Sequence, residues 1–113
     1  MTYKKILHKG DCVTVLKTLP FQSVDFIITD PPFNVKLDYA SIDDHVTDDF
    51  YAEWCKQWFL EFRKVLKLGH YGIVFTGDKK LWYLQKGLLE SGLRFQHFFK
   101  WNSPRYPYIS FWY

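Results

Sequence analysis

Two short apolar runs, each bounded by residues that break a strand, limit most strongly what this chain can fold into. The first, Val24–Thr29, is followed at once by Asp30, Pro31 and Pro32, and neither proline can donate a hydrogen bond to a neighbouring strand. The second run occupies residues 72–76. Both are too short for a helix, and continuous apolar runs of this kind are typical of strands that are covered on both faces of a parallel sheet.

Apolar residues at helical spacing fill the segments on either side of these runs. Asp11 stands where a helix N-cap belongs, after an expected strand at residues 3–8, and the helix is expected to end before Pro20. A second helix is expected from about Asp49, with Gly69 as the residue just past its end. Its apolar stripe consists of Phe50, Trp54, Trp58, Phe62 and Val65 or Leu66.

The remaining elements complete an α/β pattern. A third helix is expected at residues 79–91 and a half-buried strand at 93–101, with a loop at 34–48 and an aromatic tail without a period from 102. Strands that alternate with helices are the signature of βαβ units, so we expect an α/β fold with a mostly parallel sheet. The 113 residues suffice for one modest domain, and no repeat or boundary divides them.

The composition argues against several classes of protein. Hydrophobic residues make up 48% of the chain and aromatic residues 21%, too many for a disordered segment. The net charge of +3 is compatible with a phosphate-bearing partner without requiring one. We expect no signal peptide, no membrane span and a cytoplasmic protein, because no apolar run approaches about 18 residues. We expect no metal site, since Cys12 and Cys55 are far apart and the four histidines are scattered.

The residues after the first strand suit chemistry on an amino group. In open α/β sheets, ligands bind beyond the carboxyl ends of the strands, where Asp30, Pro31, Pro32 and Phe33 fall. The lone pair of a base amine is delocalised into the ring, and two acceptors, the Asp30 carboxylate and the Pro31 carbonyl, would free it by drawing the nitrogen toward sp³ geometry. Phe33 offers a face on which a flipped base can stack. Taken alone, the same tetrapeptide is more often a plain turn or the stop of a strand.

This tetrad belongs to a longer pattern. The pattern begins at residues 10–12 (Gly-Asp-Cys), runs through an amphipathic helix to residues 23–34, and continues through the segments 63–69, 75–78 and 100–104. It resembles the amino-methyltransferase family of DNA adenine-N6 and cytosine-N4 methylases, in which Asp, Asn or Ser followed by Pro-Pro and Tyr or Phe is the catalytic motif. The resemblance covers nearly the whole chain and implies a Rossmann-like methyltransferase fold of the kind found in restriction–modification enzymes.

The resemblance also implies a reaction and the residues that perform it. S-adenosylmethionine would be the methyl donor, and the exocyclic amine of a base flipped out of DNA would be the acceptor, with adenine N6 favoured by an Asp at the head of the tetrad. The implied catalytic residues are Asp30, Pro31, Pro32 and Phe33, and the implied cofactor contacts are Asp11, Cys12 and Asp30. Two plainer alternatives stay open, in which Asp11 only caps a helix and Cys12 is only a small apolar residue.

One part of the family pattern is absent from this sequence. The cofactor site of the family needs a glycine-rich turn after a strand, and no segment here fits it. In the family's sheet, two strands that carry the missing motifs separate the strand before residues 10–11 from Val24–Thr29. We therefore expect residues 1–113 to form a single, incomplete catalytic domain that needs a complementary subunit, a missing C-terminal half or a homo-oligomer.

Three alternatives to this hypothesis remain. The chain is a non-catalytic remnant that binds DNA or a partner, or its target is cytosine N4, or its target is RNA. Arg105 lies among aromatic residues in the tail, where contact with DNA and a place at the edge of the core are equally compatible with the sequence.

Overall fold

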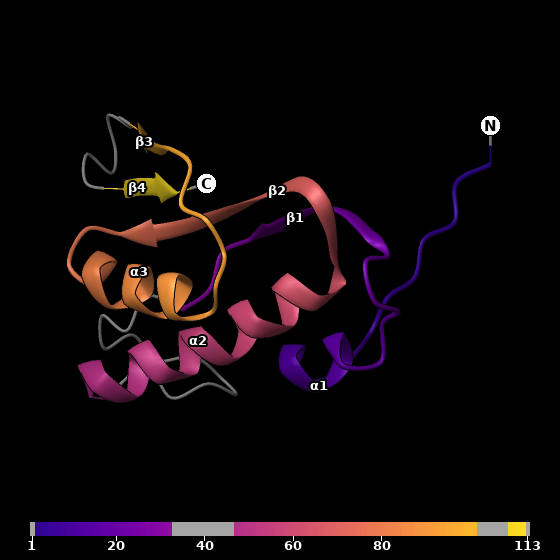
Figure 1. Cartoon of the computed structure of the whole chain (residues 1–113), viewed down its shortest axis with the longest axis horizontal. Helices are drawn as coiled ribbons and strands as arrows, with labels where there is room; N and C mark the ends of the chain where they lie inside the picture. Colours follow the sequence, from indigo (N-terminus) through magenta and orange to yellow (C-terminus); the bar gives the residue numbers. More distant parts are fainter. Residues whose placement is uncertain (1, 33–46, 102–108, 113) are drawn as a thin grey trace.

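The protein folds as one mixed sheet with helices packed on it. The computed structural model describes residues 2–32, 47–101 and 109–112, the last four and residue 101 as backbone only. The elements, in chain order, are α1 (Cys12–Leu16), β1 (Val24–Thr29), α2 (Asp48–Val65), β2 (Leu66–Gly77), α3 (Leu81–Glu90), β3 (Phe98–Trp101) and β4 (Ile109–Trp112). Figure 1 shows α2 and α3 lying along the sheet, with α1 beside the end of α2 that leads into β2.

The sheet has the order β1-β2-β4-β3. Strands β1 and β2 are parallel, as expected of two strands joined through α2, and they pair Ile27 with Gly72 and Thr29 with Val74. Strand β4 pairs antiparallel with both β2 and β3. The predicted α/β class and the parallel pairing of the two apolar runs are confirmed, and the antiparallel β4 makes the sheet as a whole mixed.

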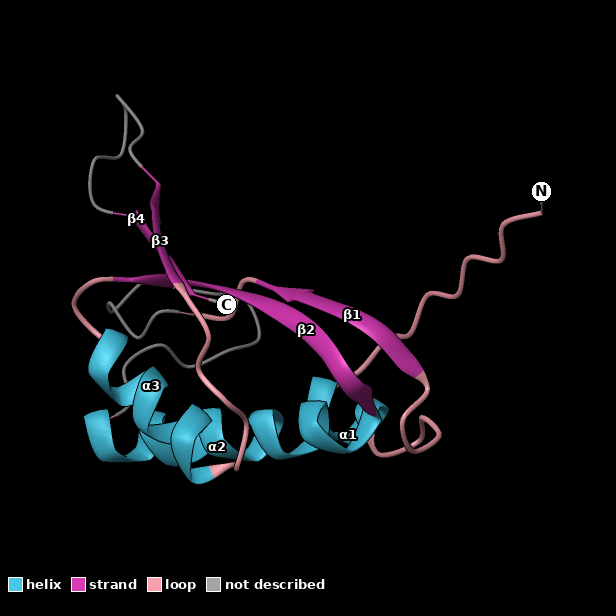
Figure 2. Cartoon of the chain, turned by 45° about the horizontal axis from the view of Figure 1, so that its top comes forward, coloured by secondary structure: helices cyan, strands magenta, loops and turns pink. Residues whose placement is uncertain are grey.

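The three helices lie on one side of the sheet, so within the described residues no element covers its other side, called here the open side (Figure 2). The open side is apolar: Phe26 is 51% exposed, Ile28 is 62% exposed, and Tyr71, which pairs with Phe26 in register, is 61% exposed. The sequence predicted that both apolar runs are covered on both faces. Within the described residues β1 is covered on one face only, because no described element packs on the side opposite the helices.

Helix α2 supplies most of the core. Its start is defined by Thr47, whose hydroxyl accepts a hydrogen bond from the backbone N–H of Phe50 at 3.2 Å, and by acidic residues in the first turn. The buried side chains recur at helical spacing and include Tyr51, Cys55, Trp58 and Phe59. The predicted stripe is therefore displaced at its start: Phe50 is exposed and its neighbour Tyr51 is buried.

The end of α2 also differs from the prediction. The helix ends at Val65, and Leu66 already has extended backbone and pairs with Val24 of β1. Gly69 therefore does not cap the helix. It lies within β2, at a φ of +75°, in the part of the strand where the register with β1 is interrupted. Pairing with β1 decides where α2 stops.

The two ends of the chain depart from the sequence prediction as well. Residues 3–8 were expected to form a strand, but they are exposed, lie in no strand and extend away from the sheet (Figure 1). A strand needs a neighbour to accept its hydrogen bonds, and no described strand lies beside this segment. At the other end, residues 93–97 precede the short strand β3 instead of belonging to it. Strand β4 falls in the tail that was expected to have no element.

Candidate functional site

The tetrad that starts with Asp30 begins where the two parallel strands β1 and β2 reach the same edge of the sheet. Asp30 follows β1 directly, and the paired strand β2 continues beside it to Gly77. The first turns of α2 approach this edge as well, because the side chain of Tyr51 contacts the backbone of Pro32. The carboxyl ends of parallel strands are the usual place for a ligand in an α/β sheet.

Among the described residues, nothing occupies the Asp30 carboxylate. Asp30 is exposed, and the described residues form no hydrogen bond or ion pair with its side chain. Partial burial of the carboxyl group raises its pKa above the ordinary value, since burial disfavours the charged form. At this edge of the sheet, the site therefore presents a carboxylate whose acceptor capacity no described residue satisfies.

The two prolines present their carbonyl groups differently. Pro31 is buried, and no described residue donates a hydrogen bond to its carbonyl. The carbonyl of Pro32 accepts a hydrogen bond of 2.7 Å from the hydroxyl of Tyr51, a residue only 2% exposed. The sequence did not predict a role for Tyr51. Its only local signal is a phenol on the buried face of a helix, where the hydroxyl must find a partner.

Tyr51 is held firmly in the structure. Its ring packs against Trp54, with the ring centroids 5.9 Å apart. One turn earlier, the carboxylate of Asp48 pairs with the ammonium group of Lys80 at 2.5 Å, which ties the start of α2 to the turn before α3. Helix α3 approaches α2 closely at Gly87. The first turns of α2 are thus fixed both to the tetrad and to α3.

The residues that the resemblance assigned to the cofactor lie in two places. Asp11 caps α1: its carboxylate accepts hydrogen bonds from the backbone N–H and the hydroxyl of Thr14, at 3.0 and 3.2 Å. Cys12 begins the same helix and is exposed. Figures 1 and 2 place α1 beside the end of α2 that leads into β2, away from the end that holds Pro32. In this arrangement Asp11 and Cys12 do not form one pocket with Asp30, so the described part of the chain does not fit a whole cofactor molecule.

Two candidate residues of the sequence analysis lie outside the described residues. They are Phe33, the last residue of the tetrad, and Arg105 in the aromatic tail. Their assignments stay predictions.

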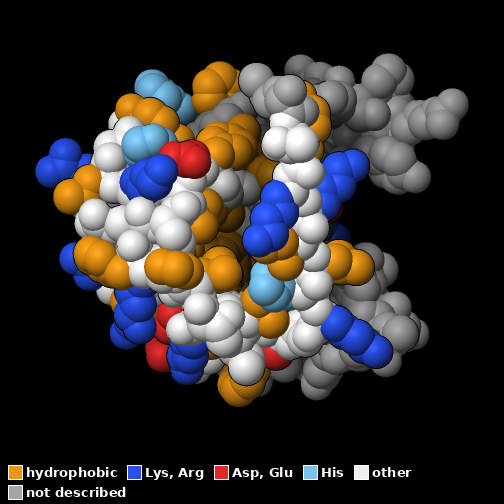
Figure 3. All heavy atoms as spheres, turned by 90° about the vertical axis from the view of Figure 1, so that its right-hand side faces the viewer, with side chains coloured by type: hydrophobic (Ala, Val, Ile, Leu, Met, Phe, Trp, Pro, Cys, Tyr) orange, Lys and Arg blue, Asp and Glu red, His pale blue; other side chains and the backbone are white. Residues whose placement is uncertain are grey.

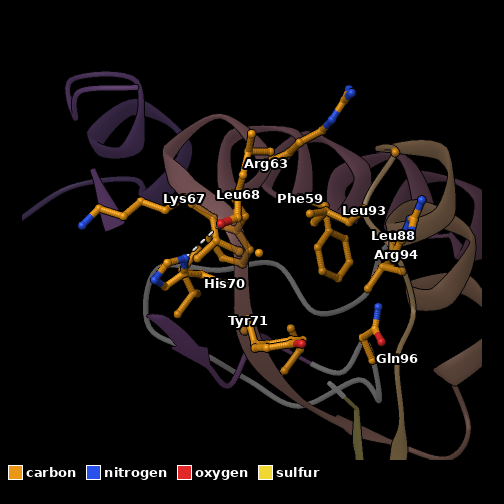
Figure 4. Close-up of a pocket in the computed structure, with 17 residues that line it drawn as sticks. Phe59, Arg63, Lys67, Leu68, His70, Tyr71, Leu88, Leu93, Arg94 and Gln96 are labelled. Carbon is orange, nitrogen blue, oxygen red and sulfur yellow. Dashed lines mark hydrogen bonds between the residues drawn. The ribbon is translucent and has the colours of Figure 1, made fainter. Parts of the chain in front are cut away.

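A pocket of about 540 Å³ lies at the other end of the sheet from the tetrad. It is bordered by the C-terminal half of α2, the first half of β2 and residues 92–96, and Figure 4 shows Phe59 directed into it. Its apolar floor and basic rim include Phe59, Phe62, Leu88, Arg63, Lys67 and Arg94. Figure 3 shows this hollow with hydrophobic side chains at its bottom and Lys and Arg side chains beside it. It is separate from the tetrad.

The described residues contain neither a cluster suited to a metal ion nor a helix suited to spanning a membrane. No three His, Cys, Asp or Glu side chains in residues 2–32 and 47–101 gather as a metal ion would require. None of the helices described above combines the length and the apolar character needed to cross a bilayer.

Comparison with known families gives a match over most of the chain. A family model described as DNA methylase, covering the N6 and N4 amino-methylases, matches residues 24–112. The match begins at the first residue of β1 and includes the tetrad and every later element. Asp11 and Cys12 precede it.

Curated relatives are also similar to more than half of the chain. Type II methyltransferase M.HpaI of Haemophilus parainfluenzae is 35% identical over 93 residues, which cover 81% of this chain and 30% of that protein. M.BamHI of Bacillus amyloliquefaciens is 36% identical over 86 residues, 73% of this chain and 20% of the relative. M.MjaVI of Methanocaldococcus jannaschii is 36% identical over 69 residues, 56% of this chain and 36% of the relative. The chain thus spans between 20% and 36% of the length of these relatives.

Proposed function

Because this chain belongs to the family of N6 and N4 amino-group DNA methylases, we propose that it carries the catalytic tetrad of an enzyme that methylates N6 of adenine in DNA. Enzymes of this family take the methyl group from S-adenosylmethionine. The observation that carries the proposal is a pair of acceptors at the carboxyl end of β1, the Asp30 carboxylate and the Pro31 carbonyl, to which no described residue donates a hydrogen bond.

The two acceptors perform complementary parts of the task. An adenine N6 amine has two N–H groups and a lone pair shared with the ring, which makes it a poor nucleophile. When both N–H groups donate hydrogen bonds, one to Asp30 and one to Pro31, the nitrogen is drawn toward sp³ geometry and its lone pair becomes available. Fixed acceptors of this kind stabilise the transition state without reorganising during the reaction. The cofactor, when bound, supplies an electrophilic methyl group, and these residues of the chain supply the orientation of the amine.

Two features of the tetrad support adenine in DNA as the target. An Asp at its head is, by resemblance, more common among adenine-N6 than cytosine-N4 enzymes. Phe33, the fourth residue, would stack on a base that has been flipped out of the duplex, a contact worth about 1–3 kcal/mol per base. The phenylalanine keeps the stacking face that a tyrosine would provide and lacks only its hydroxyl.

The enzyme also requires a second polypeptide region that completes the sheet and the cofactor site. Three features of the chain support this requirement: the apolar open side of the sheet around Phe26 and Ile28, the outer edge of β1, which pairs with no described strand, and the unpaired segment 3–8. The matched relatives are also about three to five times longer than the part that this chain spans. A region that adds strands beside β1 would satisfy all three features.

Methyl transfer and its product base test the proposal directly. The chain is combined with a polypeptide that supplies a glycine-rich strand and turn, taken from the adjoining coding sequence, and incubated with DNA and radiolabelled S-adenosylmethionine. We expect label in DNA, recovered as N6-methyladenine when the DNA is digested to nucleosides and analysed by mass spectrometry. Recovery of N4-methylcytosine would change the target base, and label in RNA alone would change the substrate. No transfer by any combination would reject the enzyme.

The isolated chain is expected to bind S-adenosylmethionine weakly, with a dissociation constant above about 1 mM, and to associate with itself. Asp11 and Cys12 do not meet Asp30 in one pocket, and exposed Phe26 and Ile28 favour association through the open side of the sheet. Isothermal titration and light scattering measure the two properties. A monomer that binds the cofactor at micromolar concentration would show that the site is complete without a second region.

A further inference from the structure

One hydrogen bond joins the tetrad to helix α2. It is made by the carbonyl of Pro32, whose direction the two prolines of the tetrad do not fix. Proline fixes φ of Pro31 and of Pro32 at about −65°. A proline also restricts the residue before it to extended backbone, which limits ψ of Asp30 and of Pro31. From ψ of Asp30 to ψ of Pro32, the last is the one backbone torsion that these restrictions do not limit. It sets the direction of the Pro32 carbonyl and of the chain that follows.

Tyr51 acts on this torsion. Its hydroxyl donates to the Pro32 carbonyl at 2.7 Å, from a side chain that is 2% exposed and packed against Trp54. The residues are 19 positions apart in the chain, so the bond joins two elements and is not part of a local turn. Because Asp48 of α2 pairs with Lys80, which precedes α3, the hydrogen bond attaches the tetrad to the two packed helices α2 and α3.

The neighbouring thiol is compatible with this direction of the hydrogen bond. Burial raises the pKa of Cys55 to about 12, although a hydrogen bond with Tyr51 opposes the rise, so the thiol is neutral at physiological pH. Tyr51 has one hydroxyl proton, which it donates to Pro32.

We propose that Tyr51 is a positioning residue of the methyl-transfer site: by holding the Pro32 carbonyl it anchors to α2 the end of the proline-stiffened segment that presents the Pro31 carbonyl and the Asp30 carboxylate to the target amine. The bond has a second consequence. It occupies the Pro32 carbonyl, which would otherwise compete with the Pro31 carbonyl, so that an approaching amine meets the Asp30 carboxylate and the Pro31 carbonyl, to which no described residue donates. This inference rests on the proposed function.

The substitution Tyr51→Phe tests the role, because it removes one oxygen atom and keeps the packing of the ring. In the assembled enzyme we expect kcat to fall about tenfold, with the KM values for DNA and S-adenosylmethionine within twofold of wild type. The matched control is Tyr83→Phe, the same change on α3, where the hydroxyl has no hydrogen bond among the described residues. The control is expected to keep the wild-type kcat, measured with both proteins folded well below their Tm.

A second measurement does not depend on turnover. The Asp30 carboxyl group is followed by ¹³C NMR as the pH is changed, in wild type, Tyr51→Phe and Tyr83→Phe. If Tyr51 holds the tetrad in place, Tyr51→Phe lowers the raised pKa of Asp30 toward its ordinary value, because the loosened segment becomes more hydrated, and Tyr83→Phe leaves it unchanged.

The possible results separate the two proposals. A wild-type assembly that transfers no methyl group defeats the proposed function, and the NMR titration then decides whether Tyr51 fixes the tetrad. A wild-type assembly that is active, together with Tyr51→Phe of unchanged kcat, overturns the positioning role. So does an equal effect of Tyr51→Phe and Tyr83→Phe, which would point to a general loss of stability.

Discussion

Replacing Asp30 by alanine is expected to lower the rate of methyl transfer by about a hundred- to a thousandfold, the loss typical when one fixed polar group is removed from a transition-state site. The substitution removes one of the two acceptors and leaves the Pro31 carbonyl. With one N–H group unbound, the amine keeps its lone pair in the ring. Single-turnover methylation of a DNA duplex by the assembled enzyme measures the effect. A rate within tenfold of wild type would show that Asp30 does not act on the amine.

The substitution Asp30→Asn provides a control that keeps the size of the side chain. We expect this substitution to raise the stability of the fold at neutral pH, for the following reason. The pKa of Asp30 is raised in the folded protein, so the stabilising contribution of its protonated form is complete at a pH below the unfolded pKa and is lost as the pH rises through the folded pKa. At neutral pH the ionised carboxylate therefore opposes folding, and Asn, which is never ionised, relieves this.

Urea unfolding at neutral pH and at a pH below the pKa of free aspartate measures the contribution. We expect Asp30→Asn to be slightly more stable than wild type at neutral pH and to lose this advantage in acid. A protein that is less stable at neutral pH would mean that the ionised group is favoured in the fold, contrary to the raised pKa.

Sequence reasoning succeeded where the signal was local. Strand β1 has the predicted bounds because two prolines follow it within three residues, and no register of a sheet can continue through them. Asp11 caps α1 as predicted, since a cap depends on hydrogen bonds within one turn. Helix α3 lies within the predicted range for the same reason. The tetrad was placed after β1 on the same local evidence.

Sequence reasoning failed where a distant partner decides the structure. Gly69 is of the residue type that commonly follows the end of a helix, but α2 ends earlier because Leu66 pairs with β1. Strand β4 forms because β2 and β3 offer it two edges, which no pattern in the aromatic tail indicates. Residues 3–8 have the pattern of a strand and lack a neighbour. Tyr51 belongs to this class too, since its value lies in a contact with Pro32 that helical spacing alone does not reveal.

The second large effect is expected at Gly87, where helix α3 closely approaches helix α2. A Cβ atom added at Gly87 of α3 would lie 2.8 Å from the carbonyl oxygen of Ala52 and from the backbone nitrogen of Lys56, and 3.0 Å from Cβ of Cys55. Backbone atoms of a helix cannot move aside as the end of a flexible side chain does. The substitution Gly87→Ala therefore forces α3 away from α2.

Two opposing terms decide the sign of this change. Alanine favours a helix over glycine by about 1 kcal/mol. Overpacking of a close contact costs about 1–3 kcal/mol, and here the upper end applies because the added atom would meet two backbone atoms of α2. We expect Gly87→Ala to lower the free energy of unfolding by about 2 kcal/mol, measured by urea denaturation.

The substitution Gly72→Ala in β2 is the matched control, since the added Cβ would lie 3.4 Å from the nearest atom, the carbonyl oxygen of Ile27, and so make an ordinary contact. It is expected to change stability by less than about 0.5 kcal/mol. Because the first turns of α2 also hold the tetrad through Tyr51, a displacement of α2 in Gly87→Ala should lower kcat in the assembled enzyme as well. If Gly87→Ala is as stable as Gly72→Ala, helices α2 and α3 are farther apart in solution than this contact requires. The packing of α2 against α3, which supports the tetrad through Tyr51, would then be less tight than the structure indicates.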